Sequence, residues 1–415
     1  MTMDSTIGRR TAIKLGLAGA ATALAPRRAR AQNPKEVKIA LVVPLSGPWA
    51  RQGILEQMGA ELAIDDVNKS GGVKALGGAK LKLVLYDTGD SAEKAKNAAQ
   101  RLVAQEPDVV GGIGCWLSSF TLAVTEVTER AELPWLTLSY SDLITGRGFK
   151  YIFQTSPTAE TQATALLPRV VDLATKSGGA KPTKVAFVGD NSASSVSFMK
   201  AIRGGVAKDL GLTIVADEVF TPPLTDATTL VQKIRSGRPD FIVMQSTNVG
   251  DDKLLLDKFA ERGITANTIP LVGGGGHWTV PELAKVAGTE HLEGVIVGLA
   301  NWPGKALGDL EKRFIAKTGE PWFGHDSIFP YAHVMIFKEA LERTGSTDRR
   351  KLGETLHKID LKDGPARYFP DGRVKFEENG RRVGAELCIV QWQKGRPVAV
   401  HPESIAVSKA IWPKS

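Results

Sequence analysis

VKIALVV, residues 37–43, is followed at once by PLSGP, residues 44–48, and this stretch decides the fold. Residues 37–43 form an apolar run that a single lysine interrupts, which is typical of a strand buried on both faces. The two prolines of residues 44–48 make a turn that no regular element could cross. A helix is expected next, because Ile54, Met58 and Leu62 recur at intervals of four. Together, these features predict the start of a βαβ unit.

Strands and helices continue to alternate after this unit. The patterns predict a strand at 81–86, a helix at 92–105, a strand at 109–113, a helix at 122–131 and a strand at 135–138. Strands separated by helices of this length form a parallel sheet that is covered on both faces. The order then repeats, since residues 182–190 resemble the first strand and its turn, residues 239–244 resemble 107–112, and residues 269–297 continue the alternation. This internal repeat predicts two similar α/β lobes.

The last hundred residues follow a different pattern. Helices are expected at 307–318, 327–344 and 349–359, and strands at 374–376 and 385–392. Because these helices need a sheet to pack on, we expect the chain to return to lobe one after about residue 300. The predicted fold is α/β, with two doubly wound Rossmann-like lobes joined by a multi-strand hinge. Lobe one is expected to contain residues 37–157 and 300–382, and lobe two residues 158–299 and 383–415. Hinged lobes close around ligands, and clefts between lobes are favoured sites for small molecules.

Residues 1–31 predict an export signal. Arg9-Arg10 precede an apolar run at 15–25, and Ala29-Arg30-Ala31 is a small-x-small cleavage site. The arginine pair is typical of the twin-arginine route, which carries folded proteins. The apolar run is shorter than the ~20 residues that a membrane span needs. A basic leader without a role is the alternative. We expect a mature protein in the periplasm that is soluble and not lipid-anchored, because no cysteine directly follows the signal.

The basic charge of the chain belongs mostly to this signal. Residues 1–31 hold six Lys or Arg and one Asp, a net +5, so the formal +8 falls to +3 without them. We therefore expect no nucleic-acid partner, and the basic spots at 349–351 and 381–382 are expected to be solvated surface. Cys115 and Cys388 could pair in an oxidising compartment, but a chain that folds before export favours two buried free thiols.

Strong catalytic and cofactor motifs are missing from the sequence. It contains no Gly-x-Ser-x-Gly, no phosphate loop and no His-Glu-x-x-His, and the glycine run 273–276 lacks the Rossmann spacing. His325-Asp326-Ser327 has the residue types of a catalytic triad, but adjacent residues are not expected to form a relay. The six histidines do not cluster at metal-ligand spacing. We expect no enzyme, no cofactor and no metal site; a secreted hydrolase is the alternative.

Small polar residues follow several of the expected strands. In open α/β sheets, ligands bind at the carboxyl ends of the strands. Ser118 or Ser119 suits the N-cap of the helix after strand 109–113, where free backbone N–H groups can hold an anion. Residues 139–142, 190–194 and 246–248 occupy equivalent strand ends. Helix capping or turn formation is the alternative for each serine alone, but turns from two lobes together predict a ligand site.

The chain resembles the extracytoplasmic solute-binding proteins of ABC importers, in the branched-chain amino-acid (Leu/Ile/Val-binding) type with the type I periplasmic fold. The resemblance rests on residues 44–48, 65–73, 85–88, 147–155 and 340–345, in the family's order. It covers nearly the whole chain after the signal. It implies capture of a small solute by hinge closure, and it implies the permease and ATPase subunits of a membrane importer as partners. We expect a monomer. A periplasmic ligand sensor that feeds a regulator is the alternative function.

The resemblance also implies roles for particular residues. In that family a serine and backbone amides after the third and fourth strands hold the ligand's carboxylate, where Ser118 or Ser119 and residues 139–141 fall. Ser194 stands where the family has an aromatic residue, and the acidic partner of the ligand's ammonium aligns with the glycine run near Gly275. Candidate ligand-binding residues are Ser118, Ser119, Ser139, Tyr140, Ser141, Ser194, Thr247, Asn248 and Gly275.

The class of solute stays open at this point. A desolvated ammonium needs an anionic or dense acceptor partner, for which Asp142, Asp190 or Asp251 could substitute. A carboxylate-bearing ligand is expected. Branched-chain or hydrophobic amino acids, amides, and aromatic or aliphatic carboxylates are all candidates.

Overall fold

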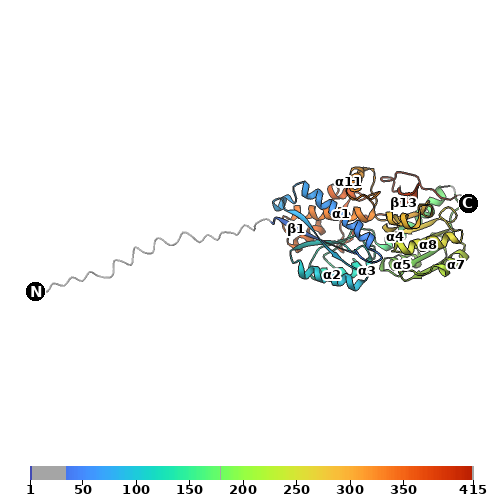
Figure 1. Cartoon of the computed structure of the whole chain (residues 1–415), viewed down its shortest axis with the longest axis horizontal. Coiled ribbons are helices and arrows are strands. Elements are labelled where there is room, and N and C mark those ends of the chain that lie inside the picture. The colour runs from blue at the N-terminus through green and yellow to red at the C-terminus, as the bar shows by residue number, and fades with distance from the viewer. Residues whose placement is uncertain (2–33, 178, 414–415) are drawn as a thin grey trace.

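The computed structural model describes residue 1 and residues 34–177 and 179–413, so the expected export signal lies outside the described residues. Two lobes lie side by side, with β1, α1, α2 and α3 in one and α4, α5, α7 and α8 in the other (Figure 1). Each lobe is built around its own sheet, and helices pack on both of its faces. This architecture confirms the predicted α/β class with two doubly wound lobes.

The sheet of lobe one is parallel and runs in the order β2-β1-β3-β4-β5. Its strands are β1 (Glu36–Val43), β2 (Lys80–Asp87), β3 (Val109–Gly114), β4 (Trp135–Thr137) and β5 (Ile152–Gln154). Around it lie α1 (Ala50–Lys69), η1 (Lys74–Leu76), α2 (Ala92–Gln105) and α3 (Ser118–Arg130). The last seven residues of β1 are almost all buried, as the apolar run predicted, because β2 and β3 flank it on both edges.

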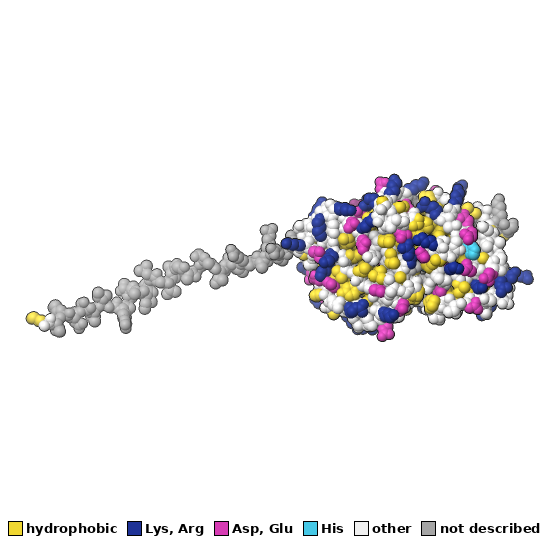
Figure 2. All heavy atoms as spheres, viewed as in Figure 1, with side chains coloured by type: hydrophobic (Ala, Val, Ile, Leu, Met, Phe, Trp, Pro, Cys, Tyr) yellow, Lys and Arg dark blue, Asp and Glu magenta, His cyan; other side chains and the backbone are white. Residues whose placement is uncertain are grey.

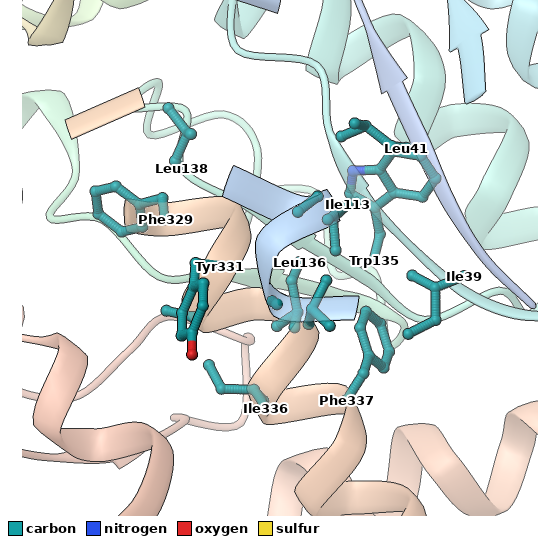
Figure 3. Close-up of a cluster of buried hydrophobic side chains, with 14 of the residues drawn as sticks. Ile39, Leu41, Ile113, Trp135, Leu136, Leu138, Phe329, Tyr331, Ile336 and Phe337 are labelled. Atoms are coloured by element: carbon teal, nitrogen blue, oxygen red, sulfur yellow. The ribbon is translucent and has the colours of Figure 1, made fainter. Parts of the chain in front are cut away.

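The chain returns to lobe one after residue 300, as the sequence predicted. The returning elements are η4 (Lys305–Leu307), α11 (Gly308–Thr318), α12 (His325–Thr344), α13 (Arg349–Lys358), β11 (Asp360–Leu361), η5 (Gly364–Tyr368) and β12 (Val374–Lys375). Helix α12 packs along α1 and against β3. Figure 3 shows its residues Phe329 and Phe337 in one cluster with Ile113 and Trp135 of the sheet. A Cβ at Gly111 would lie 2.4 Å from Cε1 of Phe337, so this glycine lets α12 sit directly on β3.

The sheet of lobe two runs in the order β14-β13-β10-β9-β8-β6-β7. Its strands are β6 (Lys184–Asp190), β7 (Thr213–Phe220), β8 (Phe241–Gln245), β9 (Leu271–Gly274), β10 (Ile296–Leu299), β13 (Cys388–Gln393) and β14 (Arg396–His401). Its helices are α4 (Ala159–Lys176), α5 (Ala193–Ala201), η2 (Ile202–Val206), α6 (Ala207–Asp209), α7 (Thr228–Gly237), α8 (Val249–Glu261), η3 (Gly276–Thr279), α9 (Pro281–Ala287) and α10 (Thr289–Leu292).

Strand β14 was not predicted, because the last strand expected from the sequence ends at residue 392. β13 and β14 pair antiparallel to make the edge of the sheet. A tight turn at Lys394 and Gly395, both with positive φ, joins the two strands. Strand β14 pairs only with β13, and just two of its six residues, Pro397 and Ala399, are buried, so the segment lacks the burial of a central strand.

Three crossings join the two lobes: one after β5, one after β10 and one between β12 and β13. Arg382 fastens the first crossing to the third, because its backbone N–H donates to the carbonyl of Gln154 and its Nε donates to the carbonyl of Thr155 at 2.7 Å. Its guanidinium pairs with Asp371 at 2.6 Å and lies over the Phe369 ring. The expectation of solvated surface at 381–382 is therefore wrong for Arg382, which is 3% exposed.

The other basic spot is only partly solvated. Arg349 is half-buried and donates from Nε to the carbonyl of Val109 at 2.7 Å. On the face that Figure 2 shows, basic and acidic side chains are interspersed.

Both Cys115 and Cys388 are buried and free, which confirms the favoured prediction. Among the described residues, no helix has the length and apolar character that a membrane crossing requires.

Candidate ligand site between the lobes

A cavity of about 30 Å³ lies between the lobes, at the carboxyl ends of the strands. It is lined by Trp116, Leu117, Ser118, Leu138, Tyr140, Gln162, Ser194, Gln245, Ser246, Thr247, Gly274, Gly275, Gly276, His277 and His325. Small-molecule sites are generally several hundred Å³ in volume. A solute of more than a few heavy atoms therefore enters only if the lobes or the lining side chains move apart.

The wall from lobe one is built on a sharp turn after β3. Gly114, Cys115 and Trp116 have φ values of +108°, +74° and +45°, a left-handed run that turns the chain directly into α3. Leu117 is the N-cap of α3 and makes no side-chain cap bond, so the predicted capping by Ser118 or Ser119 is wrong. The left-handed turn places Ser118 inside the first turn of the helix, where backbone N–H groups lack helical acceptors.

Ser118 instead connects this turn to the loop after β4. Its Oγ accepts hydrogen bonds from the backbone N–H of Tyr140 at 3.2 Å and of Ser141 at 3.1 Å. A hydroxyl oxygen has two acceptor positions and one donor. Because both acceptor positions are occupied and Ser118 lines the cavity, its O–H is available to donate to a ligand there.

The other candidate serines of lobe one have different positions. Ser119 Oγ accepts from the backbone N–H of Ala193 at 3.2 Å, and Ser141 Oγ lies 3.1 Å from Ser197 Oγ. Both bonds join lobe one to lobe two rather than line the cavity. Ser139 is fully buried, and its Oγ donates to the carbonyl of Trp116 at 2.7 Å. It supports the turn from inside lobe one.

Lobe two brings Ser194, Thr247 and Gly275 to the opposite wall, in the positions that the sequence predicted for strand ends. Thr247 donates from Oγ1 to Oδ2 of Asp190 at 2.5 Å. Asn248 does not line the cavity, because its Oδ1 accepts from the backbone N–H of Gly250 at 2.7 Å and caps α8.

The glycine run after β9 leaves room for two neighbouring polar side chains, Gln245 of lobe two and His325 of lobe one. A Cβ at Gly274 would lie 2.1 Å from Nε2 of Gln245, and a Cβ at Gly276 would lie 2.4 Å from Nδ1 of His325. A side chain at Gly276 would displace His325, and one at Gly274 would displace the Gln245 amide from its present position. This close packing accounts for the glycine run 273–276, which lacks the spacing of a phosphate-binding loop.

His325 and its neighbours form a chain of hydrogen bonds beside the cavity. The Nε2 of His325 lies 2.9 Å from the Tyr140 hydroxyl, and its Nδ1 lies 2.9 Å from Oδ1 of Asp326. The Tyr140 hydroxyl accepts from the backbone N–H of Ala300 at 3.1 Å, and Trp116 Nε1 donates to Oδ1 of Asp326 at 2.9 Å. Adjacent His325 and Asp326 contact each other, but Ser327 Oγ donates to the carbonyl of Leu55 at 3.0 Å, so the three residues form no relay, as expected. Burial raises the pKa of Tyr140, so its hydroxyl stays protonated.

Two further buried groups lie next to the cavity. His277 is 2% exposed, and burial lowers its pKa to about 3. Its Nε2 lies 3.3 Å from Oδ2 of Asp252, a fully buried carboxyl whose pKa burial raises well above the ordinary range. Ser246 donates to the other oxygen of Asp252. No group of three His, Cys, Asp or Glu in the described part of the chain could hold a metal ion.

The three aspartates considered as ammonium partners all lie elsewhere. Asp142 Oδ2 accepts from the backbone N–H of Glu160 at 3.0 Å, and Asp251 Oδ1 accepts from that of Leu224 at 2.7 Å. Asp190 holds Thr247 from behind. None of them is among the lining residues of the described chain. Sequence reasoning missed Gln245, His277 and His325 as lining residues; the signal that could have found His277 is its place directly after the glycine run.

Comparisons of the sequence with known proteins all point to periplasmic binding proteins. The sequence profile of the periplasmic binding protein family matches residues 36–397. Leu/Ile/Val-binding protein homolog 8 of Brucella melitensis is 29% identical over 393 residues, which cover 91% of this chain and 94% of the relative. Homolog 7 of the same organism is 28% identical over 410 residues and covers 96% and 97%.

Solved structures share the fold at lower identity. A leucine-binding protein, LivK, from Thermotoga maritima has a TM-score of 0.74 and 22% identity, and covers 88% of this chain and 97% of that one. A solute-binding protein of an ABC transporter from Rhodopseudomonas palustris, in complex with 3,4-dihydroxybenzoic acid, has a TM-score of 0.71 and 20% identity, and covers 88% and 95%. These structures confirm the type I two-lobed architecture. The profile match spans most of the sequence, and the chain therefore belongs to the periplasmic binding protein family.

Proposed function

We propose that this protein is the substrate-binding component of an ABC importer and captures a small solute between its lobes. The observation that carries the proposal is the composition of the cavity: Ser118, Tyr140 and His325 come from lobe one, and Ser194, Thr247 and Gly275 come from lobe two. A solute that contacts both walls stabilises the closed arrangement over the open one, which is how hinged binding proteins work. The relatives named for Leu, Ile and Val binding support the same role.

Direct bonds between the lobes support closure as part of the mechanism. Ser119 binds the backbone N–H of Ala193, and Ser141 contacts Ser197. Each bond is modest, of about 0.5–1.5 kcal/mol, so these contacts alone do not hold the lobes together against opening. The small cavity volume supports entry of the solute into an opened arrangement, which then closes around it.

The candidate ligand-binding residues divide by role. Ser118, with the backbone N–H groups that begin α3, is proposed to hold the solute's carboxylate. Tyr140, Ser194, Thr247 and Gly275 are proposed to line the rest of the solute. Of the others, Ser119 and Ser141 would act on closure, and Ser139 and Asn248 would hold the turns that carry the lining residues.

Export and domain division complete the proposal. Residues 1–31 would carry the chain to the periplasm by the twin-arginine route, where it would act as a monomer with the permease and ATPase subunits. We propose lobe bounds of 37–157 with 300–382 for lobe one, and 158–299 with 383–415 for lobe two; the separate strand sets of the two sheets support this division. Changing Arg9 and Arg10 to lysine should abolish periplasmic delivery of a reporter fused to residues 1–31. Delivery by the lysine variant would contradict this route.

The function is tested by a thermal-shift and calorimetric screen of amino acids, amides and carboxylic acids. A solute that binds only the folded chain raises its melting temperature by mass action. A solute found in this way should then be taken up by cells or vesicles that carry the cognate permease, and uptake should require this protein. Absence of binding across the screen would refute solute capture. Binding without dependent uptake would favour a sensor over an importer component.

A further inference from the structure

The lining of the cavity carries no fixed charge. Among the lining residues of the described chain there is no Asp, Glu, Lys or Arg. The polar groups are hydroxyls, amides, backbone groups and the two imidazoles of His277 and His325. A carboxylate can be held by such neutral donors, because several backbone N–H groups and a hydroxyl together stabilise a negative charge.

The lobe-two wall is neutral at the place where the sequence resemblance puts an acidic residue. Gly275 stands at that place, His277 follows two residues later in the lining, and burial keeps the His277 imidazole uncharged at neutral pH. The Trp116 ring meets it edge-on with the ring centroids 5.9 Å apart. Asp252 lies behind His277 rather than in the lining, and burial favours its uncharged form.

Two buried carboxyls outside the lining, Asp326 and Glu56, carry oxygens without a hydrogen-bond partner in the described structure: Oδ2 of Asp326 and both oxygens of Glu56. Asp326 accepts hydrogen bonds at Oδ1 from Trp116 Nε1 and contacts His325 Nδ1, each at 2.9 Å. Glu56 is completely buried, and burial raises its pKa well above the ordinary range. Neither carboxyl is among the lining residues. A ligand ammonium would therefore meet no carboxylate among the residues that line the cavity.

One neutral donor in the lining lacks a partner of its own. The side-chain nitrogen of Gln245 is buried without a hydrogen-bond acceptor, and the residue is 5% exposed. Gly274 leaves space for it, since a Cβ there would lie 2.1 Å from that nitrogen. A buried amide N–H that lacks an acceptor is costly, so this group favours a ligand oxygen beside it.

We infer that the solute is a carboxylate whose second polar group is uncharged, a hydroxyl or carbonyl oxygen, and that Gln245 and His277 select it over an α-amino acid. This inference rests on the proposed function. Burial of an ammonium without a counter-charge costs far more than neutral hydrogen bonds return. A hydroxyl or carbonyl oxygen instead accepts from the Gln245 amide and faces a neutral imidazole.

The test is a set of ligands that differ only at the carbon next to the carboxylate. Leucine, 2-hydroxy-4-methylpentanoate and 4-methyl-2-oxopentanoate form an aliphatic series, and phenylalanine, phenyllactate and phenylpyruvate form an aromatic one. Within the series that binds, the hydroxy or oxo acid should bind at least tenfold more tightly than the amino acid by calorimetry. Equal or tighter binding of the amino acid would overturn the inference and leave solute capture intact. Binding of no compound in this set or in the wider screen would overturn the proposed function itself.

Variants test the two selecting residues. Gln245→Glu and His277→Glu each place a carboxylate in the lining and should move the amino-to-hydroxy preference at least tenfold towards the amino acid. Gln232→Glu makes the same charge change at an exposed position of α7 and should leave the ratio unchanged. The readout is the ratio of two affinities, which general destabilisation does not shift. If His277→Glu does not fold, the test rests on Gln245→Glu alone. An unchanged ratio of amino-acid to hydroxy-acid affinity in a folded Gln245→Glu protein would refute selection by Gln245.

Discussion

Ser118→Ala is the substitution that most directly tests the carboxylate half of the site. The wild-type hydroxyl accepts from the backbone N–H groups of Tyr140 and Ser141 and keeps its own proton to donate. Alanine removes the donor to the solute and both acceptor contacts at once. Two effects should therefore be seen together, one on affinity and one on stability.

The two magnitudes differ and can be separated. A hydrogen bond to a charged group contributes about 1.5–3 kcal/mol, so the dissociation constant for a carboxylate should rise roughly 10- to 150-fold. The two N–H groups left without a partner cost about 1–3 kcal/mol each when fully buried. Tyr140 is only partly buried, so water can reach one of them, and a total of about 2–3 kcal/mol is expected. Unfolding entropy scales with length, which makes this a fall of ~2–4 °C in melting temperature.

Isothermal titration calorimetry on the ligand-free protein measures the affinity, and differential scanning calorimetry measures the stability. Ser119→Ala is the matched control, because it removes a neighbouring hydroxyl whose bond goes to Ala193 of the other lobe. It should weaken binding by less than tenfold. A folded Ser118→Ala protein that binds its solute within twofold of wild type would show that the carboxylate is held elsewhere.

Three further substitutions have defined outcomes. Gly276→Ala would place a Cβ 2.4 Å from Nδ1 of His325 on the other lobe and so hinder closure. Affinity for the solute, measured by calorimetry, should fall at least tenfold, while the melting temperature of the ligand-free protein should stay within about 2 °C of wild type. Unchanged affinity would disprove the close approach of the two residues. Burial lowers the pKa of His333 to about 3, so the folded state stays neutral while the unfolded chain gains a proton near pH 6.5, and stability is lost as pH falls from about 6.5 towards 3. His333→Gln should therefore lose less stability than wild type between pH 7 and pH 4 in urea titrations, and equal losses would contradict this assignment. Asp371→Ala leaves the buried guanidinium of Arg382 without its carboxylate, so the free energy of unfolding in urea titrations should fall by about 3–5 kcal/mol. A fall of less than about 1 kcal/mol would contradict this role of the ion pair.

Much of the fold could be predicted because its elements carry strong periodic signals. The run of β1 and the fourfold spacing in α1 predicted both elements, since a strand covered on both faces is apolar throughout. The return of the chain to lobe one followed from the need of α12 for a sheet. Strand β14 was missed because it is a short antiparallel edge strand with only two buried residues, and because it follows a turn rather than a helix.

For the site, the sequence predicted which strand ends contribute residues but not the hydrogen-bond partners of those residues. Ser118, Tyr140, Ser194, Thr247 and Gly275 line the cavity, because strand ends meet at one edge of a parallel sheet whatever the details of packing. The partners of each serine could not be predicted, since Oγ contacts depend on how two loops meet. His325 was missed for a related reason: it starts a helix far along the chain, and only the tertiary fold brings that helix end to the cavity.

Recognition and closure depend on the same residues in this structure. Gly276 of lobe two fits against His325 of lobe one, and Trp116 of lobe one meets His277 of lobe two edge-on. These contacts form only when the lobes are together, so the neutral wall is complete only in the closed arrangement. A solute with an unpaired ammonium would keep water around its charge and thereby oppose closure itself, not only its own binding step. Discrimination by charge should therefore be seen as faster solute release, because closure is the step that slows release.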